Sequence, residues 1–203
     1  MNYSNQGSTL GLSNPFQHTN YLVSKQMLKL FGGTFRIYEP NGSLVLFASM
    51  KAFKLKEDIR LYTGEDRQTE VLVIKARHVI DFSATYDVID PITNQPIGAL
   101  RRKGLNSMIR DEWAILDEMG NEVGAITEDS MILALLRRFA TNLIPQNFHG
   151  QISGRPVLTF SQNFNPFTLR FSLDFSDDTT GLLDRRLGIA AAILLSAIEG
   201  RQQ

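Results

Sequence analysis

The sequence predicts a mainly β protein in which a closed antiparallel β-barrel encloses one buried α-helix. Three observations lead to this fold class: a hairpin-like unit that occurs three times, a segment near the C-terminus in which apolar and polar residues alternate, and a final helix without a polar face. A helix that is apolar on all sides must be surrounded by protein or by lipid. Because an α-helix is about 10 Å across, a barrel of more than about eight strands has room for one.

The overall composition limits the classes of function. The chain has 203 residues, 43% of them hydrophobic, and its 21 basic residues balance its 21 acidic ones. Balanced charge provides no global field to attract nucleic acid, so we expect no nucleic-acid partner. The sequence has no cysteine, which excludes a disulfide scaffold, thiolate-bound metal and a cysteine nucleophile. This fits a reducing compartment, and we expect a cytoplasmic protein.

The N-terminal segment is polar and has no basic region followed by an apolar one, so it does not predict a signal peptide. We predict that residues 1–18 are a flexible arm. Residues 19–203 are expected to form a single domain. An apolar segment opens that domain at Tyr21 and is ended by Gly32 and Gly33.

The repeated unit consists of an aromatic residue, any residue, a β-branched residue, any residue and an acidic residue. The aromatic and β-branched side chains are two positions apart, so they share one face of a strand. The acidic residue can accept hydrogen bonds from turn amides, and the Asn and Gly residues that follow suit a tight turn. Each copy and the short apolar segment after it therefore predict a β-hairpin. The copies begin at Phe35, Tyr86 and Trp113, and residues 61–74 predict a further hairpin.

Residues 128–142 depart from this pattern, because their apolar residues have helical spacing. We predict a short amphipathic helix, capped by Asp129 or Ser130 and ended by Pro145, that packs on the outside of the β-structure. The alternative is a helix on a membrane surface. In both cases the apolar face contains Met131, Ile132, Leu135 and Leu136.

The clearest strand is residues 167–175, where Phe and Leu alternate with polar residues. The chain then turns into the last helix, predicted from Leu182 to Glu199. Thr180 or Gly181 is its predicted N-cap.

The apolar part of this helix, residues 187–198, spans roughly 18 Å, whereas a bilayer core needs about 30 Å. We therefore expect the helix to form the core of the barrel and not to cross a membrane. The residues expected at the centre of the core are Leu187, Ile189, Ile193, Leu194 and Ile198.

Four segments occur in a specific order: Gly-Ala-Leu-Arg-Arg-Lys at 98–103, Trp-Ala-Ile-Leu-Asp at 113–117, Val-Gly-Ala-Ile-Thr-Glu at 123–128, and Phe-Ser-Leu-Asp-Phe at 171–175 before the apolar helix. Together they resemble the phospholipid scramblase and LURP-one-related proteins of the tubby-like superfamily, over residues 21–200. The resemblance implies a barrel of about twelve strands around a central C-terminal helix. It also implies binding of anionic phospholipid or phosphoinositide head groups, peripherally at a membrane.

One segment differs from the scramblase pattern. Scramblases carry an acidic, calcium-associated segment just before the hydrophobic helix, whereas this chain has the amide-rich sequence Gln-Asn-Phe-Asn-Pro-Phe at 162–167. The Cys-rich and Pro-rich segments of the animal scramblases are also missing. These differences count against the calcium activity of the scramblases. Because the helix is also too short to span a bilayer, we rank phospholipid scrambling low, as a lower alternative.

The candidate binding residues form a basic cluster in and after the segment that begins at Gly98. Guanidinium groups bind phosphate oxygens in a bidentate manner, so such a cluster suits an anionic head group. The alternative is a solvated loop whose charge is balanced by Asp111 and Glu112. The candidates for anion or lipid binding are Arg101, Arg102, Lys103, Arg110, Arg137 and Arg138.

No catalytic or metal-binding motif is present, so we expect neither an enzyme nor a cofactor. The histidines His18, His78 and His149 are far apart in the sequence, and no metal site is expected from them. Asp174, Asp177 and Asp178 are expected to stabilise a turn and cap a helix rather than to bind calcium.

The predicted function is therefore that of a non-enzymatic barrel that binds anionic lipid as an adaptor or sensor. The alternative is a protein-interaction or structural module without a small ligand.

Overall fold

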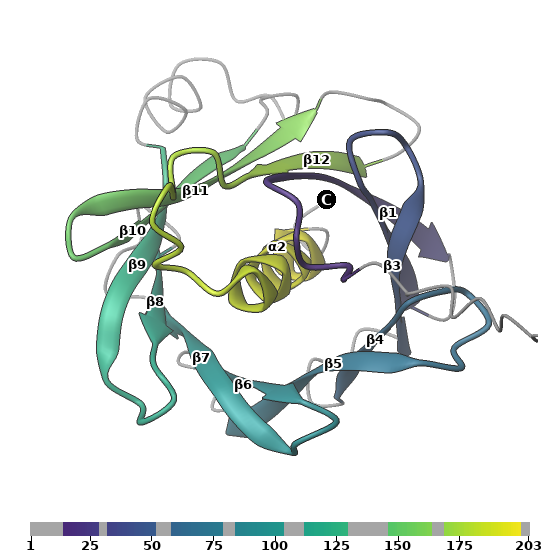
Figure 1. The fold of residues 1–203 in the computed structure, drawn as a ribbon, viewed down its shortest axis with the longest axis horizontal. Coiled ribbons are helices and arrows are strands. Elements are labelled where there is room, and N and C mark those ends of the chain that lie inside the picture. Colours follow the sequence, from purple (N-terminus) through teal and green to yellow (C-terminus); the bar gives the residue numbers. More distant parts are fainter. Residues whose placement is uncertain are drawn as a thin grey trace, which may run out of the picture.

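The computed structural model is a closed antiparallel barrel of twelve strands with one helix inside it (Figure 1). The structure describes residues 14–28, 32–51, 58–78, 84–103, 112–129, 146–163 and 169–199. Consecutive strands pair with each other, and β1 pairs with β12 to close the barrel. The strands are β1 (Asn20–Leu28), β2 (Gly32–Tyr38), β3 (Leu44–Lys51), β4 (Ile59–Tyr62), β5 (Glu70–His78), β6 (Thr85–Asp90), β7 (Gln95–Lys103), β8 (Glu112–Leu116), β9 (Glu122–Glu128), β10 (Asn147–Ile152), β11 (Arg155–Asn163) and β12 (Leu169–Asp174). The helix is α2 (Arg185–Glu199).

The predicted fold class is confirmed: the protein is mainly β, with a closed barrel around its C-terminal helix. The amphipathic helix predicted at 128–142 stays a prediction, because residues 130–142 lie outside the described residues. Glu128 belongs to the end of β9.

The three copies of the repeated unit form the hairpins β2–β3, β6–β7 and β8–β9. In every copy the aromatic and the β-branched residue are buried in the barrel interior. A register shift follows directly after each β-branched residue, at Ile37, Val88 and Ile115. Such a bulge bends its strand and increases the local twist. The repeat thus specifies both a hairpin and the curvature that a closed sheet needs.

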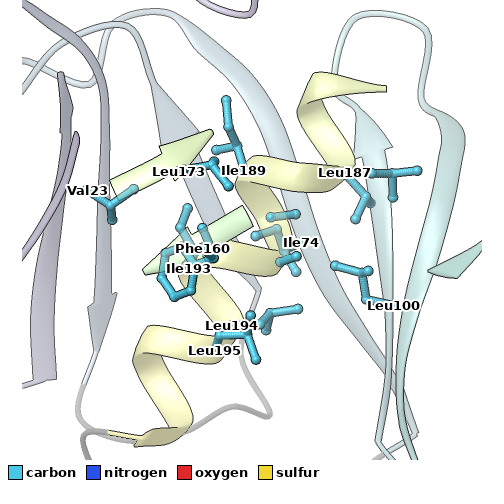
Figure 2. Packing of buried hydrophobic residues seen from close by; sticks show 14 of the residues in the cluster. Val23, Ile74, Leu100, Phe160, Leu173, Leu187, Ile189, Ile193, Leu194 and Leu195 are labelled. Carbon is cyan, nitrogen blue, oxygen red and sulfur yellow. The ribbon is translucent and has the colours of Figure 1, made fainter. Parts of the chain in front are cut away.

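α2 contacts the barrel wall on all sides. Every residue from Leu187 to Ala197 is buried, including the predicted core residues Ile189, Ile193 and Leu194. The one polar residue in this stretch, Ser196, donates its hydroxyl to the carbonyl oxygen of Ala192 at 2.6 Å. The side chain of Ile198 lies outside the described residues. Figure 2 shows wall residues from β1, β5, β7, β11 and β12 around the helix, namely Val23, Ile74, Leu100, Phe160 and Leu173.

The N-cap of α2 is Asp184, so the prediction of Thr180 or Gly181 is wrong. The Oδ1 atom of Asp184 accepts a hydrogen bond from the backbone N–H of Arg186 at 2.9 Å, which is the bond that an N-cap makes. The preceding residues are held in a turn, because the buried carboxylate of Asp178 accepts the backbone N–H groups of Leu182 at 2.8 Å and of Leu183 at 3.1 Å. Helical geometry therefore starts only after this turn.

The other end of α2 is held by a buried lysine of the wall. Lys25 follows Val23 by two residues in β1 and therefore faces the interior, where it is 2% exposed. Its Nζ atom donates to the carbonyl oxygen of Ser196 at 2.5 Å. The last carbonyls of a helix lack partners within the helix and carry partial negative charge, so an ammonium group stabilises them.

Residues 14–18, which belong to the predicted arm, lie against the end of the barrel at which α2 begins. Phe16 packs on the core. The hydroxyl of Tyr21 donates to the carbonyl oxygen of Pro15 at 3.0 Å and accepts the backbone N–H of His18 at 3.1 Å. Residues 1–13 lie outside the described residues.

The connections at this same end form what we call the turn rim. Because the strands are antiparallel and follow one another in order, alternate connections lie at the same end of the barrel. The turn rim consists of residues 39–43, 63–69, 91–94, 117–121, 153–154 and 175–184.

Candidate functional site

The basic residues at the end of β7 do not share a face, because successive side chains of a strand point to opposite sides. Arg102 follows the core residue Leu100 by two positions and is in register with the core residue Trp113. It therefore lies on the inner face, at the end of the barrel opposite the turn rim. Arg101 and Lys103 lie on the outer face, so the three residues do not converge on one phosphate.

The two outer residues form ion pairs with Glu112 of the neighbouring strand β8 and with Glu122 of β9, the strand beyond it. Arg101 Nη2 lies 2.9 Å from Glu122 Oε2. Lys103 Nζ lies 2.6 Å from Glu122 Oε1 and 3.0 Å from Glu112 Oε1. The hydrogen bond from Lys103 holds the pKa of Glu122 below its usual value, and the same bond raises the pKa of Lys103. An external anion would have to displace these carboxylates.

Ion pairs of the same kind occur elsewhere on the outer wall. Arg60 Nη1 lies 2.8 Å from Glu70 Oε2, and Arg77 Nη2 lies 2.5 Å from Asp87 Oδ1. Pairs at such exposed positions are each worth roughly 0–1 kcal/mol. Their main consequence here is electrostatic, because each pair neutralises one basic side chain of the wall.

The remaining candidate basic residues, Arg110, Arg137 and Arg138, lie outside the described residues. Two of the three acidic residues considered for calcium, Asp174 and Asp178, accept backbone N–H groups instead. Asp174 Oδ1 accepts the N–H of Ser176 at 2.7 Å, in addition to the bonds of Asp178 described above. Within the described part of the chain, no three His, Cys, Asp or Glu side chains form a group that could hold a metal.

The turn rim carries exposed apolar side chains that the sequence patterns did not indicate. The large hydrophobic residues that are exposed in the described structure are Ile92, Met119 and Leu182, with 87%, 85% and 41% of their surface accessible. Ile92 lies in the β6–β7 turn, Met119 in the β8–β9 turn, and Leu182 in the segment that leads to α2. For Ile92 and Met119 the available signal was an apolar residue within an otherwise polar turn.

The turn rim is also acidic. It contains eight acidic residues and one basic residue. Some of these carboxylates have basic partners: Asp178 Oδ2 lies 2.9 Å from Arg185 Nη1, and Asp184 Oδ2 lies 2.6 Å from Arg186 Nη2. In the described structure four others have no ion pair, namely Asp66, Asp117, Glu118 and Asp177.

The hydrogen bond from the side chain of Asn121 lowers the pKa of Asp117, so this carboxylate is ionised at neutral pH.

No protein-family model matches the chain, and no curated protein matches it. The relation to the scramblase and LURP-one-related proteins stays a prediction from the sequence. Among the helices in the described ranges, none is long and apolar enough to cross a membrane.

Proposed function

We propose that this chain is a non-enzymatic binding module that recognises a protein partner through its outer surface. The observation that carries the proposal is the occupation of the barrel interior by α2, whose residues from Leu187 to Ala197 are all buried. Barrels of the lipocalin and streptavidin kind hold a small ligand in the interior, where this chain has its helix. Recognition is therefore expected on the outside.

The outer surface suits a protein partner better than it suits an anionic head group. The wall cations Arg101 and Lys103 are already paired with glutamates, and Arg102 lies on the other face of the strand. The turn rim presents exposed apolar side chains, which are typical of protein contact surfaces.

Binding of anionic phospholipid or phosphoinositide head groups is the second candidate, and the charge distribution favours it. The chain is neutral as a whole, whereas the turn rim has seven more acidic than basic residues. The rest of the chain consequently has seven more basic than acidic residues, and Arg101, Arg102 and Lys103 are among them. We rank this function second because of the ion pairs.

The two candidates are separated by purifying the full chain from the cells that produce it and by mixing it with vesicles at low salt. For the protein-binding function we expect another protein to co-purify in a fixed ratio. We also expect no sedimentation with vesicles of phosphatidylcholine alone or with added phosphatidylserine or phosphatidylinositol bisphosphate. Sedimentation with the anionic vesicles alone, abolished in the Arg101→Glu/Lys103→Glu variant, would establish the second candidate and overturn the first.

A further inference from the structure

We propose that the turn rim is the docking surface and that it binds a protein segment combining basic and apolar side chains. This inference rests on the proposed function, because it requires a protein partner. It goes beyond that function by naming one end of the barrel and the chemistry of what binds there.

The distribution of exposed apolar residues selects this end. Single exposed hydrophobic residues are common on protein surfaces and need no explanation. Here, however, the large ones of the described structure, Ile92, Met119 and Leu182, all belong to the turn rim, while the wall carries ion pairs. Removing such side chains from water yields about 25 cal/mol per Å² of buried apolar area. The turn rim is thus the surface that gains most from being covered.

The turn that carries Ile92 is held in place by hydrogen bonds, so little conformational entropy is lost on binding. Asp90 Oδ1 accepts the backbone N–H of Ile92 at 2.8 Å, and the carbonyl oxygen of Asp90 accepts the N–H of Asn94 at 2.8 Å.

The turn that carries Met119 is held in the same way. Asp117 Oδ1 accepts the N–H of Asn121 at 2.8 Å, and the carbonyl oxygen of Asp117 accepts the N–H of Gly120 at 3.0 Å. Asp90 and Asp117 therefore shape the turns that present the two apolar side chains.

The charge of the turn rim identifies the occupant. Glu118 neighbours Met119 and is exposed, and Asp177 is exposed in the segment that contains Leu182. Neither carboxylate has a basic partner in the described structure. Lysine or arginine side chains of a partner would pair with these groups and speed association. An anionic membrane would be repelled by the same charges, and a second turn rim would be repelled as well, so the occupant is a basic protein segment.

Two pairs of substitutions test the apolar and the acidic contribution separately. Ile92→Ser/Met119→Ser removes the two most exposed large apolar side chains of the described residues, and Glu118→Lys/Asp177→Lys reverses two charges that have no ion pair there. The control is Asp58→Lys, which makes one such charge reversal at an exposed residue next to β4, at the other end of the barrel, where the carboxylate lies 3.8 Å from Arg60. Circular dichroism and urea unfolding verify that every variant folds.

Two affinities are measured for each variant. The first is the affinity for the protein that co-purifies with the full chain. The second is the affinity for two labelled peptides, one made of leucine and lysine and one made of leucine and glutamate. We expect each rim variant to bind the co-purifying protein and the leucine–lysine peptide at least ten-fold more weakly, and Asp58→Lys to bind both as the wild type does. The leucine–glutamate peptide should not bind.

Equal binding of the co-purifying protein by all variants would overturn the docking surface and leave the proposed function standing. A wild-type chain without any co-purifying protein would overturn the proposed function itself, and the inference with it. Binding to phosphatidylcholine vesicles that is lost in Ile92→Ser/Met119→Ser would make the turn rim a membrane contact, which also overturns the inference.

Discussion

The inner and outer faces of the barrel wall hold neighbouring strands together by different interactions. On the inner face the side chains are apolar and pack against α2, so that residues such as Phe35, Ile37 and Leu46 are completely buried. On the outer face, ion pairs such as Arg101–Glu122 connect neighbouring hairpins, and 39% of the surface of each of these two side chains is exposed. A small buried cluster of Ala99, Ala114 and Leu116 is an exception on the outer face.

This difference separates stability from recognition. The inner face removes a large apolar area from water, which is the dominant favourable contribution to folding. The outer ion pairs remain hydrated and contribute little to stability. Substitutions should therefore have effects on stability that fall steeply from the centre of the barrel to its outer wall.

The largest effect is expected for Ile193→Asp, since Ile193 is completely buried at the centre of the barrel. An unpaired carboxylate there is deprived of water, at a cost of at least about 4 kcal/mol. We expect the variant not to fold, as measured by circular dichroism and urea unfolding. The control Gln151→Asp places the same group at an exposed position of β10 and should fold normally. A folded Ile193→Asp variant would mean that α2 is not the core.

A smaller loss of stability is expected for Gly188→Ala, although this kind of substitution in a helix usually increases stability. Alanine normally stabilises a helix by about 0.5–1 kcal/mol relative to glycine. A methyl group at this position would overlap the buried ring of Phe175, so the helix or the ring must move. We expect a loss of about 1–3 kcal/mol in urea unfolding.

Coupling to Phe175 provides the check on that explanation. In the double variant Gly188→Ala/Phe175→Leu the smaller leucine side chain relieves the overlap. The double variant should therefore lose less unfolding free energy than the sum of the losses in the two single variants. Strictly additive losses would contradict the close packing of helix and wall.

A still smaller effect is expected for Tyr21→Phe. This substitution removes the two hydrogen bonds that the hydroxyl makes at the end of the barrel where α2 begins. The expected loss is about 1 kcal/mol at neutral pH. Burial raises the pKa of Tyr21 from 10.0 to about 12. The folded state therefore keeps a proton that the unfolded chain loses near pH 10, and stability present below pH 10 is lost as the pH rises toward 12. Urea unfolding between pH 8 and pH 11 should show a smaller alkaline loss in the variant than in the wild type.

The smallest effect is expected for Glu122→Gln on the outer wall. Its partner Lys103 holds the pKa of Glu122 below its usual value of 4.5. The resulting stability is present above pH 4.5 and is lost as the pH falls below it. At this exposure we expect a loss of about 0.5 kcal/mol at pH 7, which disappears at pH 3 and at 1 M salt. A loss as large as that of Gly188→Ala would refute the contrast between the two faces.

Local sequence patterns were sufficient for the fold and insufficient for the site. The spacing of Phe35 and Ile37, and its repetition in the later hairpins, identified the inner face because strand side chains alternate with a period of two. The basic cluster was identified from adjacency alone. Adjacent residues of a strand face opposite ways, so Arg102 is separated from Arg101 by the thickness of the wall.

By itself the sequence determined that hairpins form, that their inner faces are apolar, and that the last helix must be enclosed, because each of these follows from side chains near one another along the chain. Only the tertiary structure decided which distant groups meet. Lys25 reaches Ser196 across 171 positions, and Ile92, Met119 and Leu182 share one rim only because closure of the barrel brings alternate connections to one end. Such contacts depend on the register of all twelve strands together, which no local pattern contains.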